Sequence, residues 1–273
     1  MEIAICAIAR LENRYIREWV DYHINLGFNH IYLYDNNREN EERLSEVLTE
    51  AHLVNDSSLR GHKEEFCLSP ITIVSLHHRS YVQMYAYQDC YINGHFDWLL
   101  YIDIDEFFTF ADMNCHLEEW IEKTVSSENA DAILINWMCY GDCGHIRYID
   151  APVVERFRKP LPYWFSPTNA FGKAPENRHI QTMVRKGTDF TIFNPHIGKG
   201  NYKTVNADGT EVPNIAQQGN YTFKTAFLRH YVTKTIEEYA LQKVVRQAAD
   251  GPSVHYGVSL HLIQSLFPRC SYT

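Results

Sequence analysis

An acidic cluster follows directly on an apolar segment of this 273-residue chain. The run from Trp98 to Ile102 leads into Asp103, Asp105 and Glu106. Side chains alternate along an extended backbone, so Asp103 and Asp105 are expected on the same side. Two neighbouring carboxylates repel each other, and each has a raised pKa unless a cation lies between them. The pair therefore predicts a divalent metal held by oxygen ligands and shared with phosphate. A solvated acidic loop is the alternative.

The elements that position this cluster alternate between strands and helices. Apolar runs predict strands over residues 3–9, 30–34, 71–76, 98–102 and 130–138. Three- and four-residue apolar spacing predicts helices over 14–26, 39–51, 80–92 and near 116–125. This alternation indicates an α/β fold, a mostly parallel, Rossmann-like sheet flanked by helices. Ligands bind such sheets beyond the carboxyl ends of the strands. One crevice should be lined by Ala9-Arg10, Asp35-Asn36, Leu76-His77 and Asp103 to Asp105.

The sequence changes character from Tyr140 onward, where Gly, Pro and Asn are frequent. Short strands are predicted at 153–157, 181–185, 190–193 and 227–232. A final helix is expected from Thr235, which forms a capping box with Glu238 and continues through Val244 and Val245. No linker divides the chain, so we expect one domain over residues 1–273. Its ligand-binding half is 1–138, and 139–273 is a mixed extension that covers the crevice.

Composition and charge exclude several classes of protein. Acidic residues number 34 and basic residues 25, a net charge of −9, which argues against a nucleic-acid binder. No run of 18 apolar residues occurs, so no transmembrane helix is expected, and peripheral contact with a membrane stays open. Seven unpaired cysteines and the lack of a basic leader predict a cytoplasmic chain with free thiols.

The run from Trp98 to Phe108 resembles the Asp-x-Asp strand of glycosyltransferases with the A-type nucleotide-sugar fold. Further motifs, in the same order, resemble glycosyltransferase family 92, once a domain of unknown function, within the wider family 2 group. The matching segments are Arg10 to Asn13, Glu18 to His23, Tyr34 to Asn36, Gln83 to Cys90, Asn136 to His145, Glu155 to Phe157, Pro195-His196 and His230 to Glu238. Two positions depart from the pattern: Gln181 replaces a usual lysine, and Asp142 a usual serine.

The resemblance implies a nucleotide-sugar site in residues 1–138 and an acceptor side in residues 139–273. Such enzymes displace a nucleoside diphosphate, here expected to be UDP, from an activated sugar. Asp35 is expected to bond the uracil or ribose, Arg10 to frame the base, and Lys234 to reach the diphosphate. The expected donor-binding residues are Ala9, Arg10, Glu12, Asp35, Gln83, Tyr87, Asp103 and Lys234.

The resemblance also implies a cofactor, Mn²⁺ or Mg²⁺, that stabilises the charge of the leaving diphosphate. Asp105 is expected to bind the metal directly, and Asp103 to contact the ribose, or the metal through water. A third ligand is typically a later histidine, for which His196 and His230 are the candidates. An inverting transfer needs one general base. Glu155, which matches the family pattern, and Asp142 are its candidates.

These implications describe a metal-dependent, inverting hexosyltransferase with a saccharide or glycolipid acceptor. The family suggests lipopolysaccharide or surface-polysaccharide assembly, at the inner face of the membrane. Two alternatives remain open. A sugar nucleotidyltransferase should carry a glycine-rich basic loop after the first strand, where this chain has Ala9 to Asn13 without glycine. A non-catalytic sugar-nucleotide-binding protein would keep the fold without the activity.

Overall fold

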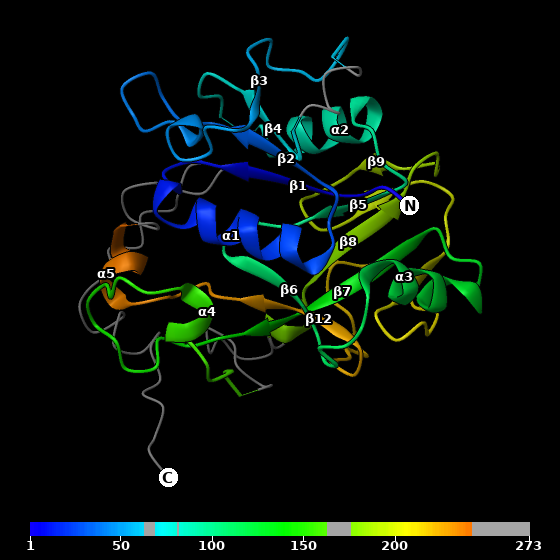
Figure 1. The fold of residues 1–273 in the computed structure, drawn as a ribbon. Helices are drawn as coiled ribbons and strands as arrows, with labels where there is room; N and C mark the ends of the chain where they lie inside the picture. The colour runs from blue at the N-terminus through cyan, green and yellow to red at the C-terminus, as the bar shows by residue number, and fades with distance from the viewer. Residues whose placement is uncertain (63–68, 81, 163–175, 242–273) are drawn as a thin grey trace.

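The structure, a computed structural model, describes residues 1–62, 69–80, 82–162 and 176–241. One ten-stranded sheet dominates it (Figure 1). Its strand order is β3-β4-β2-β1-β5-β8-β7-β12-β6, and β11 pairs with β7. The strands are β1 (Ile3–Ala9), β2 (His30–Asp35), β3 (His52–Val54), β4 (Ile71–Ser75), β5 (Trp98–Tyr101), β6 (Glu106–Phe110), β7 (Ala132–Cys139), β8 (Ile180–Arg185), β11 (Thr204–Asn206) and β12 (Ala226–His230). A separate ribbon pairs β9 (Thr191–Ile192) with β10 (Gly198–Lys199). The helices are α1 (Asn13–Leu26), α2 (Gln83–Asn93), α3 (Leu117–Ser126), α4 (Val153–Arg156) and α5 (Ile236–Tyr239).

The first five strands of that order are all parallel, which confirms the expected α/β architecture. Backbone hydrogen bonds continue past the strands at their carboxyl ends. The Asn36 amide donates to the Ala9 carbonyl over 2.9 Å, and the Leu76 amide donates to the Asp35 carbonyl over 2.9 Å. The loops after β1, β2 and β4 are therefore neighbours at one edge of the sheet, as the sequence predicts.

Strands from the second half of the chain extend the same sheet. β8 is antiparallel to both of its neighbours, β5 and β7. β12 is parallel to β7 and antiparallel to β6. The carboxyl ends of β7 and β12 and the amino end of β8 therefore lie at the edge where β5 ends. Residues after position 139 thus contribute to the edge that carries the acidic cluster.

Helix α1 holds β6, the strand that begins with the last residue of the acidic cluster. The Trp19 indole N–H donates to the Glu106 carbonyl over 2.8 Å. His23 donates from Nδ1 to the Trp19 carbonyl and accepts the Phe108 amide at Nε2 over 3.2 Å. Burial lowers the pKa of His23 to about 3, so its ring is neutral as this pairing requires. Gly27 ends the helix at φ 112°, a conformation that favours glycine.

Two predicted elements are wrong. The helix expected over 39–51 is only a 3₁₀ turn at Leu44–Glu46, followed by β3. A backbone amide inside the segment bonds an acidic side chain outside it instead: the Leu44 amide donates to Asp35. Side chains that bond the nearby backbone in this way compete with helix formation.

The strand predicted over 153–157 is the short helix α4. The carboxylate of Glu18 accepts the Val153 and Val154 amides, two groups that a helix start leaves without intrahelical partners. The capping box of Thr235 and Glu238 is confirmed at the start of α5. Val244 and Val245 lie outside the described residues.

None of the helices within the described ranges is both long and apolar enough to cross a membrane. This agrees with the absence of a long apolar run in the sequence.

Candidate functional site

Asp103 lies in contact with two side chains of α2. Its Oδ1 accepts hydrogen bonds from the Gln83 side-chain amide at 3.3 Å and from the Tyr87 hydroxyl at 3.4 Å. The Gln83 amide also donates to the Tyr87 hydroxyl over 3.0 Å. Burial, and then the charge of Asp103, raise the pKa of Tyr87 well above its ordinary value, so the phenol stays protonated. The structure therefore brings together three of the predicted donor-binding residues.

Asp105 lies beside His230, the last residue of β12. The Nε2 of His230 is 3.7 Å from the Oδ1 of Asp105, and both residues are buried. The Tyr231 amide donates to the Asp105 carbonyl over 2.8 Å, so backbone as well as side chains join the two segments. The buried Nδ1 of His230 has no hydrogen-bond partner in the structure. Two of the four predicted metal ligands are thus adjacent.

Three imidazole rings lie around the indole of Trp137, on β7. The ring centroids of His230, His179 and His196 lie 4.1, 4.9 and 5.3 Å from that of Trp137. His196 is half-buried, and its Nδ1 lies 2.9 Å from the Ile180 carbonyl. The two predicted histidine ligands therefore flank one aromatic side chain, next to the acidic cluster.

The sequence analysis names Glu106 and Gln181 but gives neither a role in the site, and it does not name His179. Glu106 is fully buried, and the Gln181 amide lies 3.0 Å from each of its carboxylate oxygens. The Asp103 amide donates to the same carboxylate over 3.1 Å. Burial, reinforced by the charges of Asp103 and Asp105, raises the pKa of Glu106 well above its ordinary value. Glu106 therefore fixes the turn between the two aspartates.

This arrangement suits a divalent cation in its donor chemistry. Carboxylate and imidazole ligands bind Mn²⁺ well, while Mg²⁺ prefers oxygen. The unpartnered Nδ1 of His230 is consistent with a ring whose environment a ligand completes. Among the described residues, no three His, Cys, Asp or Glu side chains converge closely enough to hold a metal as they stand. A bound ion would have to draw Asp105, His230 and His196 together.

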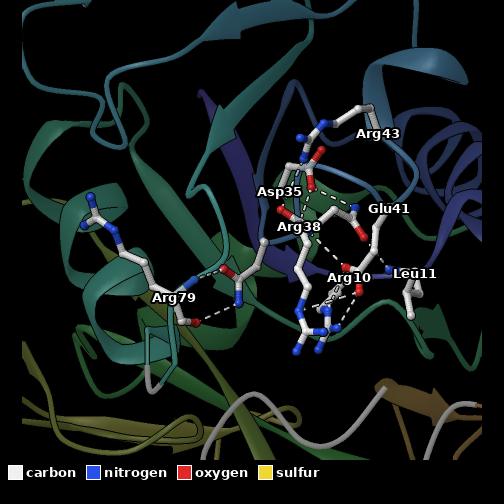
Figure 2. A network of polar contacts seen from close by, with 9 residues as sticks. Arg10, Leu11, Asp35, Arg38, Glu41, Arg43 and Arg79 are labelled. Atoms are coloured by element: carbon white, nitrogen blue, oxygen red, sulfur yellow. Dashed lines mark hydrogen bonds and ion pairs between the residues drawn. The ribbon is translucent and has the colours of Figure 1, made fainter. Parts of the chain in front are cut away.

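The predicted nucleoside-binding residues lie at the ends of β1 and β2 (Figure 2). Arg10 forms a two-bond ion pair with Glu41, with Nε–Oε2 at 2.9 Å and Nη2–Oε1 at 2.5 Å. Asp35 accepts the Asn37 amide at 2.9 Å, the Asn37 side chain at 2.7 Å and the Leu44 amide at 3.1 Å. The Asp35 carboxylate therefore organises its own loop in this structure.

Three further predicted donor residues are buried. Ala9 ends β1, and Glu12 occupies the N-cap position of α1, where its carbonyl accepts the Tyr15 amide. Lys234, only 1% exposed, follows β12 with its Nζ 4.5 Å from the centroid of the Tyr15 ring. All three come at or just after the carboxyl end of a strand.

The two candidate general bases differ in environment. Asp142 follows β7, and it is buried in a turn where its carboxylate accepts the Gly144 amide over 3.0 Å. Burial raises its pKa. The Tyr140 amide donates to the His230 carbonyl, so the Asp142 loop begins beside the histidine. Glu155 is exposed on α4.

Strained backbone gathers at the same edge. Within the described ranges, seven residues other than glycine have φ between 47° and 58°. Six of them follow the carboxyl end of a strand: Leu11, Ser57, His77, His78, Cys143 and Lys234. This left-handed conformation costs about 1–2 kcal/mol for a residue with a side chain, and it concentrates at functional sites. Backbone strain thus marks the same edge as the side-chain contacts.

Comparison with solved structures gives only partial overlaps. The match to TarS of S. aureus, residues 1–349, covers 97% of this chain and 70% of the TarS chain, with a TM-score of 0.41 and 10% identity. HddC of Yersinia pseudotuberculosis covers 72% of each chain, with a TM-score of 0.33 and 11% identity. Overlaps of this extent transfer no substrate or residue role.

Sequence comparison is more specific. A glycosyltransferase family 92 protein of Ricinus communis is 25% identical over 248 residues, which are 86% of this chain and 39% of that protein. This chain thus spans well under half the length of the relative. The family model described as glycosyltransferase family 92 matches residues 3–235, from β1 to the N-cap of α5. Because that match covers the described strands and the acidic cluster from Asp103 to Glu106, the chain belongs to glycosyltransferase family 92.

Proposed function

We propose that this chain is a metal-dependent, inverting glycosyltransferase that moves a sugar from a UDP-sugar to a saccharide or glycolipid acceptor. The observation that carries the proposal is the approach of His230 to Asp105, beside Asp103 with its Gln83 and Tyr87 contacts. Family membership supports the class of reaction. Action in polysaccharide assembly at the inner face of a membrane is part of the same proposal.

The acidic cluster and the residues beside it would bind the diphosphate of the donor. A bound Mn²⁺ or Mg²⁺ would offset the negative charge that develops on the leaving diphosphate. Asp105 and His230 would hold the ion, with His196 as the third ligand. Gln83 and Tyr87 donate to Asp103 and fix its carboxylate for the ribose or a metal-bound water. Lys234 would contact the diphosphate only after leaving its buried place on Tyr15.

Asp142 is the better placed general base. It is buried beside the His230 segment with a raised pKa, whereas Glu155 is exposed to solvent. A carboxylate with a raised pKa accepts a proton more readily from an acceptor hydroxyl at neutral pH. In this scheme Asp142 removes that proton as the hydroxyl oxygen attacks the anomeric carbon and the diphosphate leaves from the opposite face.

A panel of UDP- and GDP-sugars, scored for hydrolysis or transfer with Mn²⁺ and with EDTA, tests the proposal. We expect metal-dependent turnover of at least one UDP-sugar, which the Asp105→Asn variant loses. Asp21→Asn, on the exposed face of α1, is the matched control. Formation of a sugar nucleotide from a sugar phosphate and UTP would favour a nucleotidyltransferase. Tight UDP binding without any turnover would favour a non-catalytic binding protein.

A further inference from the structure

The carboxylate of Glu41 holds Arg10 just after the end of β1. Glu41 meets its guanidinium with two hydrogen bonds, the geometry that fixes an arginine most firmly (Figure 2). The two side chains are only 16% and 15% exposed. A partly enclosed pair of this kind keeps one orientation better than an exposed pair does, because fewer rotamers are open to it.

Glu41 is itself fixed by a second arginine. The Arg38 amide donates to its Oε2 over 2.9 Å, and the Arg38 Nε lies 3.9 Å from its Oε1. The hydrogen bond from Arg10 is the largest cause that lowers the pKa of Glu41 to about 2. The carboxylate is therefore ionised throughout the physiological range and always available to Arg10.

The loop that carries Glu41 is fastened to the loop after β1 at two more points. The Leu11 amide donates to the Asn37 side chain over 2.9 Å, and the Asn13 amide to Glu42 over 2.7 Å. Asn37 is in turn bound to Asp35. The loops after β1 and β2 therefore form one unit, to which Arg10 and Glu41 both belong.

The strand order says which part of a donor this unit would meet. β1 lies between β2 and β5, and the acidic cluster follows β5. With the diphosphate at Asp103 and Asp105, the strand ends directly beside β5 that run parallel to it are those of β1 and β2. On the other side of β5 lies the antiparallel β8. Adjacent strands are about 4.8 Å apart, so Arg10 is one strand away on the nucleoside side.

We propose that Glu41 is the positioning residue that orients Arg10 toward the nucleoside of the donor. The proposal rests on the proposed function and adds to it a residue that no sequence motif indicates. A guanidinium fixed before binding loses less conformational entropy when the ligand arrives, so the pair raises affinity without contacting the ligand through Glu41. The change would lower the affinity for the uridine group, which UDP and uridine share.

Calorimetry with uridine and with UDP plus Mn²⁺ tests this proposal on Glu41→Gln, Arg10→Lys and the double variant. Lysine cannot form the two-bond pair. We expect each single variant to weaken both ligands by about tenfold, since the cation at position 10 is then no longer fixed before the ligand binds. The double variant should bind no more weakly than the weaker single variant, because both changes remove the same interaction.

Glu50→Gln is the matched control. Glu50, just before β3, forms a two-bond pair with the exposed Arg17 side chain of α1, at 2.6 and 2.9 Å. The Glu50→Gln variant should leave the affinities for uridine and for UDP unchanged. Unchanged affinities in Glu41→Gln with a lower melting temperature would show a merely structural pair. Losses that multiply in the double variant would also overturn the positioning role. If the unaltered chain bound no UDP at all, the proposed function would fall together with this inference.

Discussion

The His230 ring lies 3.7 Å from the carboxylate of Asp105, although the two residues belong to different halves of the chain. The antiparallel pairing of β12 with β6 sets this distance, since it places His230 opposite Glu106 in register. A site that joins an early strand end to a late one depends on the whole sheet. Substitutions at either residue therefore test one shared function.

Asp105→Asn is expected to abolish Mn²⁺-dependent UDP binding and to leave the fold intact. The change removes one of three neighbouring acidic groups; burial, and then the charges of Asp103 and Asp105, raise the pKa of Glu106. Stability should therefore not fall. Titration calorimetry with and without Mn²⁺, beside a melting curve, makes the measurement. Unaltered metal-dependent affinity would rule out the metal role of Asp105.

His230→Ala and Lys234→Ala are expected to weaken UDP more than uridine. Both groups are assigned to the metal-bound diphosphate, which uridine lacks. The ratio of the two dissociation constants, measured by calorimetry, separates this pattern from the equal losses expected at Arg10. Equal losses would instead mean that His230 and Lys234 only support the fold.

Asp142→Asn is expected to lower turnover by roughly 10²–10⁴-fold while donor affinity stays within a few-fold. A general base acts on the acceptor proton in the transition state, so ground-state binding of the donor should not change. Glu155→Gln is the comparison, and its exposed carboxylate predicts near-normal turnover. The opposite ranking of the two variants would restore Glu155 as the base. Retained anomeric configuration in the product would exclude a single displacement.

Arg156→Met is expected to destabilise the protein by about 3–5 kcal/mol, because it leaves Glu238 buried without its partner. Arg156 donates to both oxygens of Glu238 at 2.9 and 3.0 Å, and Tyr15 donates at 2.9 Å. Chemical denaturation measures the change. Arg158→Met, on an exposed neighbour, is the control. A loss below about 1 kcal/mol would mean that this contact is dispensable.

The same pair predicts a pH dependence. Burial alone would raise the pKa of Glu238, but hydrogen bonds from Arg156 and Thr235 outweigh it, so the pKa lies below the ordinary 4.5. A depressed pKa contributes stability above the unfolded value and loses it as the pH falls. The unfolding free energy of the unaltered protein should therefore drop below about pH 4.5 more steeply than that of Arg156→Met. Parallel curves would contradict this account.

Much of the parallel core could be predicted from the sequence. Strand and helix periodicity located β1, α1, β2, β4, α2 and β5 nearly at their observed bounds. The carboxyl-end rule placed Asp103 in the crevice, and the family resemblance named Gln83 and Tyr87, which contact it in the structure. Local pattern was sufficient where each element forms mainly from its own residues.

Long-range contacts account for what could not be predicted. Gln181 on β8 bonds Glu106 at the start of β6, although 75 residues separate the two positions and no local spacing links them. The segment around Glu41 has helical periodicity, but its backbone bonds the side chain of Asp35 instead. In both cases the structure depends on a bonding partner that lies outside the local sequence pattern.

The position of β8 has a consequence for how the chain acquires its structure. β8 is made from residues 180–185 but lies between β5 and β7, which are synthesised much earlier. Until it arrives, both older strands keep an unpaired edge that can recruit strands of other molecules. A fragment that stops at residue 138 would lack this strand and should aggregate. The late insertion is also a pairing of high contact order, so it should be a slow step of folding.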